Sequence, residues 1–276
     1  CQLRSGEWDA ALHLAMRVLA AREAAPTSRF VAQIVAGLVM ARRGQVAGVA
    51  LLEEARALAL ASDSLVYLAP WLTARAEAAV LLEQPAAPWA AALTQSLRTA
   101  TGPLASSLAY WGWVCGAPGP ACADPASPYC LEVAGQWEEG AAAWTARGAP
   151  YEAARAYAHG DDEAALRTAL ATCEALEARP LAAQIRRQLR ALGAQRISRG
   201  PQTATRRNPA GLTRREREVL HVLMDDATSP EIARRLHLSP RTVENHIAAI
   251  CTKLGVSNRA DAITVAQRLG LAAEIE

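Results

Sequence analysis

Helical periodicity constrains the fold of this chain more than any other feature of its sequence. Up to about residue 192, apolar residues recur every three or four positions, Ala and Leu are abundant, and the alternation typical of half-buried strands is missing. Hydrophobic residues make up 51% and charged residues 20% of the 276 residues, a composition typical of folded, soluble proteins. The pattern therefore predicts an all-α fold.

A short signature recurs within this helical region. Each copy begins with a glycine, at Gly6, Gly44 and Gly135, and a Trp stands two residues later in the first and third copies. Gly44 follows Gly6 by 38 positions, which is close to the period of helix-pair repeats. The pattern resembles a degenerate tetratricopeptide array, so we expect a helical-repeat region over residues 1–192. The seven Trp residues would fill the grooves between paired helices; a ligand cage is the alternative.

Two segments rich in Pro and Gly interrupt the helical pattern. Residues 117–129 contain four prolines, so no helix can cross them. Residues 193–211 combine Gly-Pro and Asn-Pro pairs with arginines, and residues 186–209 hold seven Arg and no acidic residue. We predict that 193–211 is an extended basic linker, followed by a separate domain at 212–276.

The last domain contains signals for the starts of four helices. A capping box is a Ser or Thr whose side chain, together with that of a Glu three residues later, satisfies the free N–H groups at a helix start. The four starts are Thr213 with Glu216, Thr228 with Glu231, Ser239 before Pro240, and Ser257. Only a short turn at 237–238 separates the second helix from the third. These are the elements of a helix-turn-helix, the commonest DNA-reading motif.

The third helix, at about 240–253, has two faces of opposite character. At about 100° per residue, Val243, Ile247, Ile250 and Leu254 form one apolar stripe. The opposite side is short and polar, which suits the major groove: Asn can pair with adenine, Arg with guanine, Glu with cytosine N4, and Ala can touch a thymine methyl. The alternative is an ordinary solvated helix face. The predicted base-reading residues are Arg241, Glu244, Asn245 and Ala248.

Many residues of this domain match one family at fixed spacing. The matching segments are Leu212-Thr213, Arg215-Glu216, Glu218-Val219-Leu220, Glu231-Ile232-Ala233-Arg234-Arg235-Leu236, Ser239-Pro240-Arg241-Thr242-Val243, His246, Lys253-Leu254-Gly255-Val256, Asn258-Arg259 and Ala262. Over about 60 residues the domain resembles the LuxR/GerE-type helix-turn-helix. Upstream, Pro150-Tyr151-Glu152-Ala153-Ala154, Leu189-Arg190, Leu192-Gly193, Arg199-Gly200-Pro201, Thr205 and Asn208-Pro209 resemble the large ATP-binding LuxR regulators.

The resemblance implies roles for particular residues. Helix 240–253 would be the recognition helix, and the fourth helix would pair with its twin in a homodimer on double-stranded DNA, through Ile263 and Ala266. A protein or small-molecule effector would act on the repeat region. The residues placed near phosphates would be Thr228, Ser229, Thr242, His246, Lys253 and Arg259.

The chain departs from the family pattern at several positions. Many relatives have Lys or Arg where this chain has Glu244 and Ala248, which weakens the expected attraction to phosphates. Pro230 replaces a frequent Lys and removes one phosphate contact. Asp226 replaces a frequent Gly at a left-handed position, which Asp tolerates better than most residues. Affinity would then depend more on Arg241, Lys253, Arg259 and the linker arginines.

Other function classes find little support in the sequence. It contains no phosphate-binding loop, nucleophile elbow, zinc-protease motif or dinucleotide fingerprint, so we expect no enzyme and no cofactor in this chain. Any ATP site would lie upstream of Cys1, because the chain opens as if in the middle of a larger regulator. The alternative function is an interaction scaffold whose helix-turn-helix serves only dimerisation.

The cysteines and the uncharged stretches bear on cellular location. Most of the six cysteines are scattered singly, and Cys115, Cys122 and Cys130, which lie fairly close in a Gly/Pro-rich loop, have no histidine near them and match no zinc spacing. A metal site in that loop is the alternative, but we expect reduced thiols, no metal and a cytoplasmic protein. The longest uncharged run, at 99–123, is interrupted by prolines, and the chain opens without a signal-like segment. We therefore expect neither secretion nor a membrane span.

Overall fold

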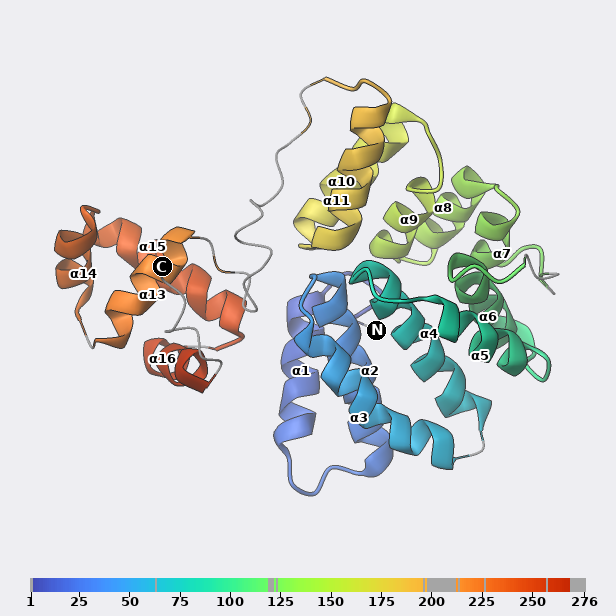
Figure 1. Cartoon of the computed structure of the whole chain (residues 1–276), viewed down its shortest axis with the longest axis horizontal. Coiled ribbons are helices and arrows are strands. Elements are labelled where there is room, and N and C mark those ends of the chain that lie inside the picture. The colour runs from blue at the N-terminus through green and yellow to red at the C-terminus, as the bar shows by residue number, and fades with distance from the viewer. Residues whose placement is uncertain are drawn as a thin grey trace. The chain divides into compact units, whose positions relative to one another are not determined.

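The computed structural model describes residues 2–62, 64–118, 122, 124–195, 197, 212, 214–225, 227–256 and 258–268. Every regular element among them is an α-helix, which confirms the predicted all-α fold. The chain divides into two compact units, Cys1–Gly200 and Pro201–Glu276, each with its own core (Figure 1). Most of the predicted linker at 193–211 lies outside the described residues.

The first unit is built from consecutive helices that pack against their neighbours in the chain. In addition, α2 contacts α4 and α4 contacts α6, an arrangement typical of helix-pair repeats. The helices are α1 (Trp8–Ala20), α2 (Pro26–Arg42), α3 (Ala47–Ala61), α4 (Leu65–Leu81), α5 (Ala87–Leu97), α6 (Gly102–Val114), α7 (Pro128–Val133), α8 (Trp137–Ala146), α9 (Pro150–Tyr157), α10 (Glu163–Ala175) and α11 (Arg179–Ala191).

The recurrent glycine of the signature lies in a turn just before a helix, and at Gly44 and Gly135 this turn also follows the end of the preceding helix. Gly6, Gly44 and Gly135 all have positive φ, between 78° and 85°, which glycine adopts without strain. After α2, Gly44 N–H donates to the Ala41 carbonyl and the next residue donates to the Met40 carbonyl, which satisfies the free carbonyls of the last turn. The signature is therefore a helix-terminating turn that reverses the chain.

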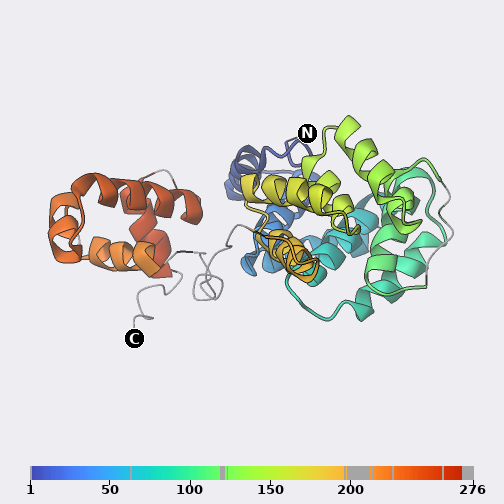
Figure 2. The ribbon, with the colours of Figure 1, turned by 90° about the horizontal axis from the view of Figure 1, so that it is seen from above.

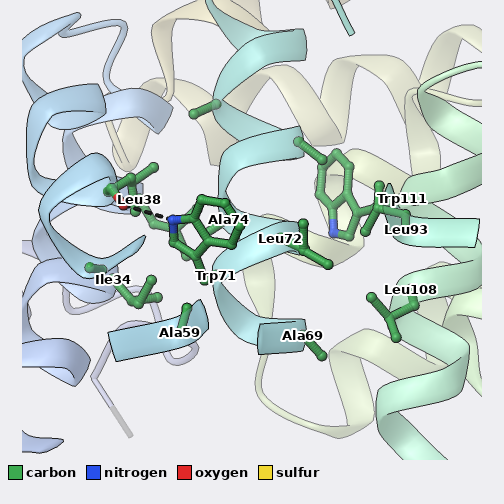
Figure 3. Close-up of a cluster of buried hydrophobic side chains, with 14 of the residues drawn as sticks. Ile34, Leu38, Ala59, Ala69, Trp71, Leu72, Ala74, Leu93, Leu108 and Trp111 are labelled. Carbon is green, nitrogen blue, oxygen red and sulfur yellow. Dashed lines mark hydrogen bonds between the residues drawn. The ribbon is translucent and has the colours of Figure 1, made fainter. Parts of the chain in front are cut away.

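The largest core of the first unit lies on both sides of α4. Figure 3 shows Trp71 pointing toward α2 and α3, while the adjacent Leu72 points toward Leu93 of α5 and Leu108 of α6. The indole N–H of Trp71 donates to the Leu52 carbonyl at 2.8 Å, so this buried polar group is satisfied. Helix α4 is thus a central element of this half of the unit.

The two ends of the helical array meet. Helices α9, α10 and α11 share a second core with α1 and α2, and α11 contacts α2. Figure 1 shows α10 and α11 above the upper ends of α1 and α2, and Figure 2 shows them over the blue N-terminal helices. Trp8 and Tyr151 pack edge to face, with ring centres 5.2 Å apart. Arg42 is buried beside both rings and pairs with Glu77 at 2.6 Å and Glu152 at 3.1 Å. The array is therefore closed on itself, which the repeat pattern alone did not predict.

Aromatic residues of α6, α7 and α8 surround another buried arginine. The Arg155 guanidinium lies 4.2 Å from the Tyr110 ring centre, with Tyr129, Trp144 and Trp111 within 5.7 Å. Because Arg155 occupies the space between the rings, the structure favours the predicted packing role of these Trp residues over a ligand cage.

The loop between α6 and α7 corrects one expectation. Its described residues are not helical, as the prolines predict. However, Cys122 and Cys130 form a disulfide, with Cα atoms 5.5 Å apart, whereas we expected only reduced thiols. The loop turns back to the start of α7 and brings the two cysteines together, which their spacing alone does not reveal. Cys115, Cys173 and Cys251 are free.

The second unit contains the predicted helix-turn-helix elements around a small core. Of the inward-facing residues expected for the first two helices, Val219, Leu220, Leu223 and Ile232 are at most 2% exposed. The described helices are α13 (Arg214–Met224), α14 (Ser229–Leu236), α15 (Pro240–Leu254) and α16 (Arg259–Arg268).

The predicted helix starts can be compared with the structure at two positions. At α14 the Glu231 carboxylate accepts from the Thr228 backbone N–H and hydroxyl, both at 2.7 Å, as expected for a capping box. These hydrogen bonds lower the pKa of Glu231. At α15 the Ser239 hydroxyl accepts from the Thr242 N–H at 3.1 Å. Thr213, Asp226 and Ser257 lie outside the described residues, so the predictions for them stay predictions.

Within the described part of the chain, none of the helices combines the length and the apolar character that a membrane span requires.

Candidate nucleic-acid interface

The turn between α14 and α15 sets the direction of the third helix of the domain. His237 ends α14 in the left-handed conformation, with φ 52° and ψ 49°, and the Leu238 N–H donates back to the Ala233 carbonyl at 2.9 Å. Two residues later Ser239 caps α15, and Pro240 occupies its first turn. The two helices pack against each other, so α14 supports α15.

Helix α15 has the two faces that its sequence predicts. Val243 and Ile250 are fully buried, and Ile247 and Leu254 pack half-buried against the same core. The side chains predicted to read bases are on the exposed side of the helix: Arg241, Glu244, Asn245 and Ala248. Among the described residues Arg241 makes no ion pair, so its guanidinium is available to a ligand.

Three cationic side chains near this face are engaged within the unit. Lys253 Nζ lies 2.8 and 2.6 Å from the two carboxylate oxygens of Glu216. Arg259 donates to the Ala227 carbonyl, and Arg215 donates to the Leu236 carbonyl and pairs with Glu218. Sequence reasoning did not foresee the contacts to Glu216, Ala227 and Leu236, since each joins residues more than 20 positions apart in the chain.

The geometry of this unit agrees with the comparisons with known proteins. The family model for the luxR family of bacterial regulatory proteins matches residues 210–266. The spore germination protein GerE of Bacillus subtilis is 48% identical over 59 residues, which are 21% of this chain and 80% of that protein. This chain belongs to the LuxR family.

Longer proteins share the same kind of segment. The transcriptional regulatory protein DesR of Bacillus subtilis is 44% identical over 59 residues, 21% of this chain and 30% of DesR. Mb0914c of Mycobacterium bovis is 36% identical over 72 residues, 26% of this chain and 8% of that protein. No solved structure matches the chain significantly. The second unit is thus a LuxR-type helix-turn-helix DNA-binding domain, and these matches leave the role of the first unit open.

The residues expected near phosphates in this LuxR-type domain lie on α14, α15 and α16. Thr228 is exposed and Ser229 half-buried at the start of α14, while Thr242 and His246 are half-buried on α15. The Thr228 hydroxyl donates to Glu231, and the Thr242 hydroxyl is 2.7 Å from that of Ser239. Both threonines therefore shape the helix starts in this structure, and their contact with phosphate stays a prediction.

The two α16 residues expected at a dimer contact, Ile263 and Ala266, both pack against the core of their own unit, and the dimer contact stays a prediction. Ala266 is fully buried in the core of its own unit, and Ile263 packs half-buried against that core. A second subunit therefore cannot reach Ala266 while α16 stays packed. The apolar stripe of α16 holds the helix onto its own domain. The side of α16 that is exposed comprises Ala260, Asp261, Thr264 and Gln267.

Proposed function

We propose that this LuxR-family chain is a sequence-specific transcription regulator whose helix α15 enters the major groove of double-stranded DNA. The observation that carries the proposal is the contrast between the two sides of α15. Val243 and Ile250 anchor the helix in the core, while Arg241 and Asn245 are exposed on the other side. A helix held by one face with short polar side chains on the other is what groove entry requires.

The exposed side chains support direct base reading. Asn245 can pair with N6 and N7 of adenine, Arg241 with O6 and N7 of guanine, and Glu244 can accept from N4 of cytosine. Ala248 is small enough to approach a thymine methyl group. We propose that these four residues select the operator, and that Thr228, Ser229, Thr242 and His246 orient the domain on the phosphates.

The proposal includes a homodimer on DNA, because helix-turn-helix proteins commonly read two half-sites related by two-fold symmetry. The exposed side of α16, with Ala260, Thr264 and Gln267, is our candidate for the subunit contact. These residues are three or four positions apart and so lie on one helix face. Ala260 and Thr264 are short, which would let two helices approach closely, and the Gln267 amide can hydrogen-bond across the contact.

We propose further that the first unit senses an effector or a protein partner. Helix-pair repeats commonly bind ligands on the extended surface that the stacked helices create. The resemblance of its signature to tetratricopeptide repeats supports this role. A DNA-binding regulator of this kind would act in the cytoplasm, where bacterial DNA lies.

Selection from a random pool of DNA duplexes, using the full chain, tests the main proposal. We expect one sequence motif to be enriched. The affinity for the selected duplex should fall linearly with salt on logarithmic axes, because binding neutralises phosphates and releases counterions. Fluorescence anisotropy at several salt concentrations measures this slope.

The rival function is an interaction scaffold whose helix-turn-helix serves only dimerisation. The exposed Glu244 favours this function, as does the even balance of nine acidic and nine basic residues over 210–276. If no duplex is retained at low salt while sedimentation shows a dimer, the rival is correct and the main proposal fails.

A further inference from the structure

An ion pair joins the first helix of the DNA-binding unit to the end of its recognition helix. Glu216 lies in the first turn of α13 and Lys253 in the last turn of α15. Both carboxylate oxygens of Glu216 accept from Lys253 Nζ, at 2.6 and 2.8 Å. The two side chains are only 8% and 18% exposed. The ammonium group is therefore held within the unit.

The pair lies where it can set the angle of α15 against α13. The apolar stripe of α15 anchors the helix by the buried Val243 and Ile250 and, in the last turn, by the half-buried Leu254. Lys253 adds an ionic contact to α13 in that same last turn. Each charge also stabilises its own helix, because a carboxylate is favoured near a helix N-terminus and an ammonium near a C-terminus.

We propose that Lys253 is a positioning residue for DNA recognition, which acts through Glu216 by fixing the orientation of α15. This inference rests on the proposed function. It replaces the phosphate contact that family resemblance implies for Lys253. The Lys253 ammonium is shared between two carboxylate oxygens, so it would have to break this partly buried ion pair to reach DNA, which costs free energy.

A double-mutant cycle with Lys253→Met and Glu216→Gln tests the proposal in the full chain. Because Glu216 has a further interaction in the unit, the cycle is needed to isolate the coupling between the two residues. Two quantities are measured for each variant: the affinity for the duplex enriched from the random pool, with its salt slope, and the denaturant midpoint of the second unit.

A positioning role predicts that both single variants change the affinity for the selected duplex in the same direction. Each should weaken binding to the selected duplex by about tenfold, the double variant should be no weaker than the worse single one, and the salt slope should not change. A phosphate contact predicts opposite behaviour. Lys253→Met would then reduce the slope by about one, and Glu216→Gln would leave binding unchanged or strengthen it. That result would overturn the proposal.

A milder variant covers the case in which Lys253→Met does not fold. Glu216→Asp keeps the charge but shortens the side chain by one methylene, so it should weaken binding to the selected duplex under our proposal. Unchanged affinity in this variant would overturn it.

The exposed pair Arg235–Asp225, whose side chains are 56% and 58% exposed, is the matched control. Arg235→Met and Asp225→Asn should show no coupling in the denaturant midpoint, because exposed ion pairs contribute little. If the chain binds no duplex at all, the proposed function fails. The denaturant midpoints of the Lys253 and Glu216 variants still measure the coupling between these two residues when no DNA is bound. If that coupling is absent, the positioning role is refuted whether or not the chain binds DNA.

Discussion

At the scale of single residues, Arg241 is the one cation among the four residues that we propose to read bases. Lys253, Arg259 and Arg215 are engaged inside the unit, and Glu244 adds a negative charge on the exposed side of α15. We therefore expect these residues to attract phosphates only weakly. Under our proposal, recognition depends on hydrogen bonds to base edges, for which Asn245 offers both a donor and an acceptor.

We expect Asn245→Ala to weaken binding to the selected duplex by about 1–3 kcal/mol, because a bidentate contact to one base is lost. Binding to a shuffled duplex of the same length should be nearly unchanged, since its phosphates are the same. Anisotropy titrations with the two duplexes measure the difference. Equal losses on both would show that Asn245 does not read a base.

At the scale of elements, the ends of α14 and α15 depend on local backbone conformation. Helix α15 ends at Gly255 with φ 69°, and the Val256 N–H donates to the Cys251 carbonyl at 3.0 Å. Helix α14 ends at His237, whose φ of 52° is also left-handed. A residue with a side chain is strained in this conformation, whereas glycine is not.

Substitutions at these two positions should have opposite effects on stability. Gly255→Ala should lower the free energy of unfolding of the second unit by about 1 kcal/mol. The added methyl group meets no atom within 4 Å, so strain in the backbone is the only cost. His237→Gly should raise that free energy by up to about 1 kcal/mol. Denaturant unfolding monitored by circular dichroism measures both, and changes of the same sign would contradict this account of the helix ends.

At the scale of the whole molecule, the two units have separate cores, and the first unit buries ion pairs within its core. In the first unit, Glu132 is fully buried and pairs with Arg155 at 2.8 Å, while Trp144 donates to it at 2.7 Å. Burial alone would raise the pKa of Glu132, but the Arg155 guanidinium and the hydrogen bonds to the carboxylate outweigh it and lower the pKa. The charged form is therefore part of the folded first unit.

Glu132→Gln should destabilise the first unit by about 3–5 kcal/mol at neutral pH, because it leaves the buried Arg155 without a counter-charge. The second unit should unfold as before. Folding lowers the pKa of Glu132 below its ordinary value of about 4.5. The contribution of Glu132 to the free energy of unfolding is therefore complete above pH 4.5, and it is lost as the pH falls through the lower pKa of the folded state. The difference between wild type and variant should therefore shrink on acidification below about pH 4.5.

Calorimetry across this pH range separates the transitions of the two units and measures the effect. Glu163→Gln is the control, because its pair with Arg167 is exposed and lies within one helix. A variant Glu132→Gln that shifts both transitions equally would show that the units are not independent.

Much of the fold follows from local patterns that act within a few residues. Apolar periodicity predicts the helices and the buried stripe of α15, and the capping residues Thr228 and Ser239 mark where helices begin. The exposure of Arg241 and Asn245 was also predictable, because the geometry of one helix fixes which residues oppose the buried ones. Each of these features depends only on residues that are close together in the sequence.

Contacts between distant residues were decided by the packing of complete helices. The pairing of Lys253 with Glu216, 37 positions away, the burial of Ala266, and the meeting of Trp8 with Tyr151 depend on how whole elements are oriented. An apolar stripe predicts that a helix face will be buried, but it does not predict which other helix that face will pack against. The sequence by itself therefore determined the helices and the polar face of α15 that we propose to read DNA. The tertiary structure decided which charged side chains are paired within the unit, because ion pairing depends on distances that only the packing of whole helices sets.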